Sequence, residues 1–367
     1  MAGAVAGADT GADTGAVAGT GTGTRPLRRV LVLGAGGRVC TDVLPALASL
    51  PDHYRVDGVF ARSRRALEVG GQTIQTRDFR SLRDEDLAAA DLVYVAVSKG
   101  AVPAVLQRLA QHPHEHLDLL LDTPVLLFKH FGHAQLLESY RNVWVAEDCV
   151  HLPWLEVVER AAADWMGMPT TVDFERSAYR YHGFALLKQL FDGAPVRSAR
   201  RRRIPGGQRL ELQFEGGACG VLVEPRDYAT GHWTIRGPGG GITDGPEVGD
   251  DLRRLEFVAE DTRALGFQLG GTRHLLRAGE AELLGPLEPG DTPTSRTDDL
   301  KRVGLARLLL GVAEGRGAWP LWEGLDDMVI DWSLEKAGRY RATRWTSVKH
   351  PTGRALLGGA LRMVSKG

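Results

Sequence analysis

The chain has 367 residues, 43% of them hydrophobic and 25% charged, and its formal net charge is −1. This length suits two domains with substantial cores, and the near-zero charge gives no general attraction to nucleic acid or to an anionic membrane. The three cysteines lie far apart and form no metal-binding motif, so we expect no metal and a reducing, cytoplasmic environment. No apolar run is long enough to span a bilayer.

The first 25 residues differ from the rest of the chain. They are almost wholly Ala, Gly, Thr, Val and Asp, and they repeat the letters Gly-Ala-Asp-Thr. Such residues cannot bury enough apolar area to offset the ordering of their backbone. Residues 1–25 are therefore predicted to be a disordered low-complexity tail.

A glycine turn follows the first apolar run. Val30–Leu33 is typical of one buried parallel strand, and helical spacing of apolar residues begins at Val39. Between them, Gly34 would permit a tight turn and Gly36 would let a pyrophosphate approach the backbone. Val39 stands where the usual dinucleotide pattern has its third glycine, so helix and strand cannot pack as closely as in the standard turn.

The start of this helix is the predicted cofactor site. The amides of Gly37 and Arg38 would point at a pyrophosphate from the positive end of the helix dipole. A strand, a glycine turn and a helix in this order favour a bound dinucleotide. The alternative is an ordinary strand-to-helix turn in a sheet that binds no nucleotide.

Basic residues follow the second predicted strand, Tyr54–Phe60. In dinucleotide folds the residue about 20 positions past the glycines contacts the ribose, and an acid there favours NAD. Here Arg62 and Arg64, with the Ser63 hydroxyl, could hold a 2′-phosphate. This pattern favours NADP(H) over NAD(H), and the alternative is a solvated basic turn.

Strand-like and helix-like segments alternate as far as Asp148, which is typical of a doubly wound parallel sheet. Residues 26–150 are therefore predicted to form a Rossmann dinucleotide-binding domain. Its further strands are expected at Leu92–Val97, Leu117–Leu121 and Val143–Ala146, and its helices at Val102–Ala110 and Gly132–Tyr140. Ligands bind such sheets at the carboxyl ends of the strands. We expect one edge to gather Gly34–Arg38, Arg62, Ser98, Lys99, Asp122, Thr123 and Glu147.

From residue 151 the pattern changes to strands with glycine turns, framed by helices. Residues 151–367 are predicted to be an α+β domain with an open, mostly antiparallel sheet, and the fold class is α/β overall. The arginine run Arg200–Arg203 has no interleaved aromatics and indicates a solvated strand edge, not a nucleic-acid surface. The last helix, Gly324–Lys336, is expected to bury Leu325, Met328, Val329 and Trp332.

The order of parts resembles the glucose–fructose oxidoreductase, inositol dehydrogenase and MocA family. Besides the glycine turn, the resemblance rests on Asp122-Thr123-Pro124, where the family usually has Glu-Lys-Pro, on the segment 142–154, on Tyr181-His182-Gly183-Phe184, and on glycine turns at 216–220 and 237–241. It implies a Rossmann domain followed by a domain whose open sheet often mediates homo-oligomers. It also implies hydride transfer between a nicotinamide and a sugar, polyol, imine or related small molecule.

The chain departs from that family at its catalytic positions. The family lysine falls on Thr123, which has no proton to donate near neutral pH. The family Asp-x-x-x-His pair falls on Ala178 and His182, so no carboxylate–histidine pair is expected. A C=N or conjugated C=C acceptor is therefore favoured over a simple sugar alcohol. The alternative is a non-redox enzyme or cofactor-binding protein, of lyase, isomerase or cyclase type, on the same fold.

Three residues are the candidate catalytic groups: His182, Tyr181 and Lys99. His182 opens a helix, where the dipole lowers the pKa of an imidazole, and a tyrosine lies beside it. Each has an ordinary alternative, since His182 could be a core or capping residue and Lys99 a solvent contact. Glu147 and Asp148 could orient the substrate or cap a helix. Trp154, Trp233 and Tyr181 could form an aromatic wall, and the alternative is that the tryptophans are simply core residues.

Overall fold

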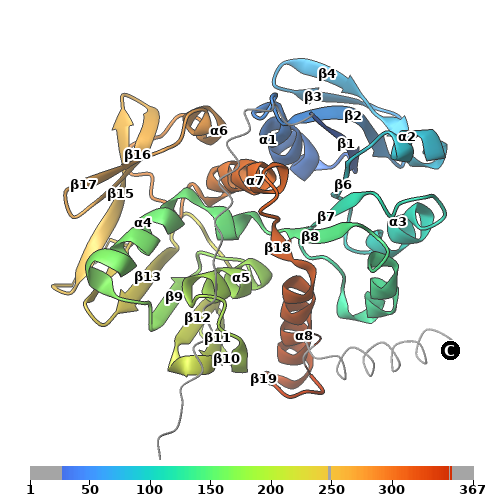
Figure 1. Ribbon diagram of the computed structural model, residues 1–367. Coiled ribbons are helices and arrows are strands. Elements are labelled where there is room, and N and C mark those ends of the chain that lie inside the picture. Colours follow the sequence, from blue (N-terminus) through green and yellow to red (C-terminus); the bar gives the residue numbers. More distant parts are fainter. Residues whose placement is uncertain (1–26, 247–248, 347, 349–367) are drawn as a thin grey trace, which may run out of the picture.

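The computed structural model describes residues 27–246, 249–346 and 348, and Figure 1 shows two sheets with helices around and between them. The predicted tail, residues 1–25, lies outside the described residues. The first sheet has seven strands in the order β18-β8-β7-β6-β1-β2-β5. Their bounds are β1 Arg28–Leu33, β2 Tyr54–Ala61, β5 Arg77–Asp78, β6 Leu92–Val95, β7 Asp118–Asp122, β8 Asn142–Ala146 and β18 Trp319–Pro320.

Six of these strands run parallel, as the alternating pattern predicts. The central ones are continuous apolar runs because both sheet faces are covered, and β6 is buried along its whole length. It ends at Val95, two residues earlier than expected. The predicted helix Gly132–Tyr140 is instead a 3₁₀ helix over Phe128–Leu137.

Further helices and a hairpin complete the first domain. They are α1 Leu44–Ala48, α2 Asp84–Ala88, α3 Val102–Leu109 and the hairpin of β3 Ala66–Val69 with β4 Gln72–Gln75. The hairpin follows β2 directly, so the segment Arg62–Arg65 is a short turn between two strands. The 3₁₀ helix η4 (Asp148–His151) leads out of β8 into the second domain.

The second sheet has ten strands in the order β17-β16-β15-β14-β13-β9-β12-β11-β10-β19. Only the pairs β12–β9 and β14–β15 are parallel, so the sheet is mostly antiparallel, as predicted. The bounds are β9 Thr171–Glu175, β10 Val196–Ile204, β11 Gly207–Phe214, β12 Cys219–Glu224, β13 His232–Gly237, β14 Gly240–Thr243, β15 Leu252–Glu260, β16 Arg263–Leu269, β17 Thr272–Leu275 and β19 Arg339–Arg341.

Helix α7 (Thr297–Ala313) lies between the two domains (Figure 1). It packs against α1 of the first domain and against η4, α4 and α6. Its apolar side chains Val303, Leu305, Leu308 and Leu309 are completely buried, which makes this helix part of the core that joins the domains. The other helices of the second domain are α4 Pro153–Ala161, α5 Arg180–Leu190, α6 Glu280–Leu284 and α8 Leu321–Ala337.

The segment around α8 belongs to both sheets. Strand β18 before it pairs with β8, and β19 after it pairs with β10. Within α8, Leu325, Met328 and Val329 are buried as expected, but the assignment of Trp332 to the core was wrong. Its side chain is 41% exposed and covers the ring of Phe128 from the solvent side, with 4.2 Å between ring centroids.

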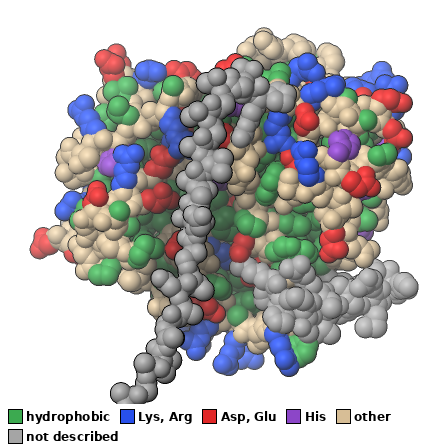
Figure 2. Space-filling view, in the orientation of Figure 1, with side chains coloured by type: hydrophobic (Ala, Val, Ile, Leu, Met, Phe, Trp, Pro, Cys, Tyr) green, Lys and Arg blue, Asp and Glu red, His purple; other side chains and the backbone are tan. Residues whose placement is uncertain are grey.

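The arginine run lies on β10. Strand β19 pairs with Ser198–Arg200 of β10, so β10 forms the edge of the sheet only outside that pairing. Beyond that pairing, Arg202 and Arg203 are exposed. Figure 2 shows basic side chains gathered at the lower end of the molecule, below β10 and β11. In the part of the chain that the structure describes, no helix combines the length and the apolarity that crossing a membrane requires.

Candidate functional site

The glycine turn brings β1 against its neighbours. Gly34 has φ +131°, and a Cβ atom there would lie 2.0 Å from the carbonyl oxygen of Ala96, beyond the end of β6. Only glycine fits such a close approach in this backbone conformation. The Gly34 amide donates to the carbonyl of Phe60 at 2.8 Å, so the end of β2 lies beside the turn.

The residues after the turn leave room and donors for a ligand. Nothing lies within 4 Å of where a Cβ atom of Gly36 or Gly37 would stand. The amides of Gly37 and Arg38 have no backbone acceptor among the described residues. A nucleotide pyrophosphate therefore fits this place. Val39, in the position of the third glycine, is fully buried and begins a wider π-helical turn, Val39–Val43.

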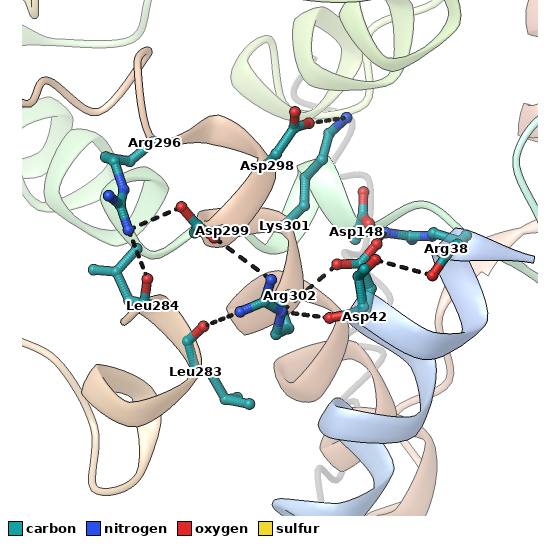
Figure 3. Close-up of polar contacts among 12 residues, drawn as sticks. Arg38, Asp42, Asp148, Leu283, Leu284, Arg296, Asp298, Asp299, Lys301 and Arg302 are labelled. Carbon is teal, nitrogen blue, oxygen red and sulfur yellow. Dashed lines mark hydrogen bonds and ion pairs between the residues drawn. The ribbon is translucent and has the colours of Figure 1, made fainter. Parts of the chain in front are cut away.

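The side chain of Arg38 reaches the carboxyl ends of β7 and β8. It forms ion pairs with Asp148, with Asp42 at 3.0 Å and with Asp122 at 3.5 Å, and Figure 3 shows Arg38 beside Asp148 and Asp42. Tyr94 donates its hydroxyl to Asp122 at 3.3 Å. Burial raises the pKa of Asp122, and the Arg38 guanidinium opposes that shift.

The basic segment predicted to read the ribose is exposed. Arg62, Ser63 and Arg64 form the turn after β2, and Arg62 has no ion pair among the described residues. The carbonyl of Phe60 accepts from the amide of Gly34 in the glycine turn, and Arg62 comes two residues after Phe60 in the chain. Ser98, after β6, is also exposed, and its carbonyl accepts from the amide of Ala101.

His182 does have a carboxylate partner, so the expectation that the pair is missing was wrong. Its Nδ1 lies 2.5 Å from Oε1 of Glu147, and both side chains are buried. Glu147 directly follows β8 in the first domain, whereas the carboxylate of the family pattern would stand at Ala178, four residues before His182. Glu147 Oε1 also accepts from the amide of Cys149 at 3.4 Å, so the same carboxyl group caps η4. No partner of His182 Nε2 is recorded among the described residues.

Burial sets the electrostatics of this pair. It holds the pKa of Glu147 well above its usual value, and the neighbouring charge of Asp148 adds to the shift. Burial, followed by the positive charges of Lys301 and Arg38, holds the pKa of His182 well below its usual value. The direction agrees with the sequence prediction, although burial and nearby cations outrank the helix dipole as its cause. Both shifts favour the uncharged forms of the pair, a carboxylic acid beside a neutral imidazole.

A lysine that the sequence did not single out lies beside the pair. Lys301 is in the second turn of α7, with a side chain only 8% exposed. Burial lowers its pKa, but the acidic groups around it, among them Cys149 and Tyr228, outweigh that effect and raise it overall. Helix α7 comes this close because Gly304, three residues later on the same face, lies against the backbone of Asp148. A Cβ atom on Gly304 would stand 2.4 Å from the Asp148 carbonyl oxygen.

Tyrosines surround the other side of His182. The ring centroids of Tyr181 and Tyr179 lie 4.5 Å and 6.2 Å from that of His182. Lys99, exposed after β6, places its Nζ 5.1 Å from the Tyr181 ring centroid. The three predicted catalytic residues, His182, Tyr181 and Lys99, are thus brought together.

The predicted aromatic wall was wrong in its tryptophans. Trp154 and Trp233 stack on each other with ring centroids 4.6 Å apart, and each is only 2% exposed. Tyr181 makes its ring contacts with Tyr179 and His182 instead. The two tryptophans therefore belong to the core.

Thr123, at the position of the family lysine, follows β7 and is joined to Pro124 by a cis peptide bond. Next to it in space, Glu147, Asp148, Cys149 and His182 place one ligand atom each within 4.8 Å of one another. Arg38 already pairs with Asp148, and the Cys149 thiol has its pKa raised by burial. A cation at this cluster would have to displace the guanidinium and ionise the thiol.

No family model matches the chain, and no curated protein matches it. Solved structures do. A putative myo-inositol dehydrogenase from Sinorhizobium meliloti 1021 is 13% identical, with a TM-score of 0.58 over 86% of this chain and 100% of that one. The myo-inositol dehydrogenase from Lactobacillus casei, solved with NAD(H) and myo-inositol, is 12% identical, with a TM-score of 0.56 over 87% and 97%.

A third similar structure is the WlbA dehydrogenase from Bordetella pertussis in complex with NADH and UDP-GlcNAcA. It is 16% identical, with a TM-score of 0.55 over 87% of this chain and 99% of that one. Identities this low establish the fold and not the chemistry. The predicted architecture is confirmed: the chain has the fold of the glucose–fructose oxidoreductase, inositol dehydrogenase and MocA group of oxidoreductases.

Proposed function

We propose that the protein is a nicotinamide-dependent oxidoreductase acting on a small or medium organic molecule at the junction of its two domains. The observation that carries the proposal is the His182–Glu147 pair, which joins the second domain to the carboxyl edge of the first sheet. The glycine turn, with its open space and its two amide donors, lies at the same edge. The nicotinamide cofactors in two of the similar structures support the same assignment.

A bound nicotinamide would supply or accept the hydride, and the chain's own groups would move the proton. The substrate atom being reduced would take a proton from Nε2 of His182. The imidazole would recover it at Nδ1 from the Glu147 carboxylic acid, which ends as a carboxylate. Lys301, whose positive charge lowers the pKa of Glu147, would stabilise that carboxylate once it forms.

This relay suits a basic acceptor atom. The donor in this relay is the N–H of a neutral imidazole, which is a weak acid and therefore releases its proton most readily to a basic nitrogen or to an enolate-like carbon. Thr123 offers no titratable proton in place of the family lysine. We therefore favour an imine or a conjugated C=C acceptor over the secondary alcohol of a sugar.

The cofactor is proposed to be NADP(H). Arg62 and Arg64 are exposed beside the glycine turn, and no acidic residue pairs with Arg62 in the described part of the chain. A charged hydrogen bond to a 2′-phosphate contributes about 1.5–3 kcal/mol, which corresponds to a preference for NADPH of about tenfold or more. Replacing Arg62 with Asp should weaken NADPH binding more than NADH binding in a fluorescence titration. Equal affinities in the unmodified protein would overturn this assignment.

The activity is tested with NADPH and a panel of cyclic imines and conjugated enones, following the absorbance of the reduced nicotinamide. His182→Gln and Glu147→Gln should each lower turnover by about 10²–10⁴-fold, because each removes one member of the relay. Nucleotide affinity should stay nearly intact in both variants. His116→Gln, which changes an exposed histidine of the first domain, is the matched control. Full activity of both relay variants would refute the assigned roles.

A further inference from the structure

Two cations near His182 share a single carboxylate. Oδ1 of Asp298 lies 3.7 Å from Arg226 Nη1 and 3.8 Å from Lys301 Nζ. The Asp298 side chain is 70% exposed, whereas that of Arg226 is 30% exposed and that of Lys301 is 8% exposed. Two positive charges, one of them almost fully buried, thus face one solvated negative charge. Figure 3 shows Lys301 reaching only Asp298 among the labelled residues.

The two cations are held in place by tyrosine rings. The Arg226 guanidinium lies 3.7 Å from the ring centroid of Tyr179 and 4.7 Å from that of Tyr228. Lys301 Nζ lies 5.6 Å and 5.9 Å from the same two rings. Cation–π contacts of this kind fix a charge without neutralising it, so both groups keep hydrogen-bond donors to offer.

Arg226, one of the two cations, also lines an open cavity of about 520 Å³. Tyr179 and Arg226 line it together with Arg180, Arg203 and Glu224. Arg180 is already engaged, because it pairs with Glu224 at 2.6 Å and with Asp331 at 2.9 Å. Arg203 has no ion pair among the described residues, and the Asp298 carboxylate that pairs with Arg226 is mostly exposed, so these two cations can bind an anion more readily than Arg180 can.

We propose that Arg226 and Lys301 form a subsite for an anionic oxygen group of the substrate, a carboxylate or a phosphoryl group. Asp298 neutralises the two cations in part while the subsite is empty, and it swings toward solvent when the anion binds. The Tyr179 ring faces both Arg226 and His182, so the anionic group lies one aromatic ring away from the proton donor. The substrate is therefore a compact molecule whose charge is close to the reducible bond. The statement that the anion belongs to the substrate rests on the proposed function, whereas the binding of an anion at Arg226 and Lys301 does not.

The probes are inorganic phosphate and acetate, each added to protein saturated with NADPH so that the nucleotide site is filled. Line broadening of the ³¹P signal and of the acetate methyl signal reports binding without any need for turnover. Arg226→Gln should weaken binding of at least one probe about tenfold, as expected for a charged hydrogen bond. Arg202→Gln, an equal loss of charge on exposed β10, should leave it unchanged.

Asp298→Asn provides a test of opposite sign. It removes the competing carboxylate, so binding should tighten by about threefold, the effect of one exposed ion pair. If the variants change the binding of phosphate and of acetate alike, the subsite accepts anions in general. If they change the binding of only one probe, that probe identifies the group as phosphoryl or carboxylate. The proposal is overturned if neither probe binds the unmodified protein, if Arg226→Gln behaves like Arg202→Gln, or if Asp298→Asn weakens binding.

The two proposals fail separately. If the unmodified protein does not bind NADPH in a parallel fluorescence titration, the proposed function fails. The comparison between Arg226→Gln and Arg202→Gln still reports on the subsite in that case, because both proteins then have the same vacant nucleotide site.

Discussion

Lys188 and Lys301 are both buried lysines, but their surroundings differ. Lys188, on α5, is 1% exposed, and its ammonium group pairs with Asp327 at 2.5 Å and with Glu323 at 3.0 Å. Lys301, on α7, has one carboxylate at 3.8 Å, and that carboxylate is mostly in solvent. A buried charge whose partners are complete holds a structure together, whereas one with donors to spare is typical of a binding site.

The largest expected effect is a loss of stability on replacing Lys188, the lysine whose charge is fully paired. Lys188→Met should lower the free energy of unfolding by about 3–5 kcal/mol, because it removes the ammonium group that pairs with the buried Asp327 carboxylate. Urea denaturation at neutral pH measures this change. Lys336→Met, on the exposed end of α8, is the control and should be close to neutral. A loss below about 1 kcal/mol for Lys188→Met would remove the distinction between the two lysines.

Lys301→Met should show the reverse pattern. The free energy of unfolding should change by no more than about 1 kcal/mol, because Asp298, the carboxylate that pairs with Lys301 among the described residues, is mostly exposed, and the cost of burying the ammonium disappears. Turnover with a substrate of the protein should fall at least about tenfold, since a charged contact is lost. Parallel denaturation and steady-state measurements separate the two outcomes. Destabilisation as large as that of Lys188→Met would place Lys301 among the structural residues.

The smallest effect is a shift in pH dependence. Lys301 lowers the raised pKa of Glu147 through its positive charge. The relay needs Glu147 protonated, so the rate should fall as pH rises through that pKa. Removing the cation raises the pKa further, so the alkaline limb of the rate profile should move to higher pH in Lys301→Met. In Lys188→Met the limb should stay where it is, and movement in both variants would show that the shift is not local.

The first sheet could be predicted well because a strand buried on both faces is one apolar run, as in β6 and β7. The short strands were missed for a physical reason. β18 and β19 have two and three residues, and they form because β8 and β10 offer unpaired edges to them. Such strands depend on a distant neighbour and carry no readable pattern of their own.

The candidate site could be predicted only where a residue follows a strand or opens a helix. Lys99, Tyr181 and His182 meet those conditions and lie together in the structure. Glu147 was recognised as a strand-end residue, but its pairing with His182 joins positions 35 residues apart. Lys301 lies in the second turn of a long helix, and only the packing of Gly304 on Asp148 brings it to the site.

The arrangement of α8 has a consequence for the synthesis of the chain. Strands β18 and β19, on either side of that helix, complete one edge of each sheet. A nascent chain that has not yet released residues 319–341 holds two nearly finished sheets, each with an open edge strand. Open edges add strands from other chains, so this is the stage at which the protein is most exposed to misassembly. The same late segment then closes both edges in one step.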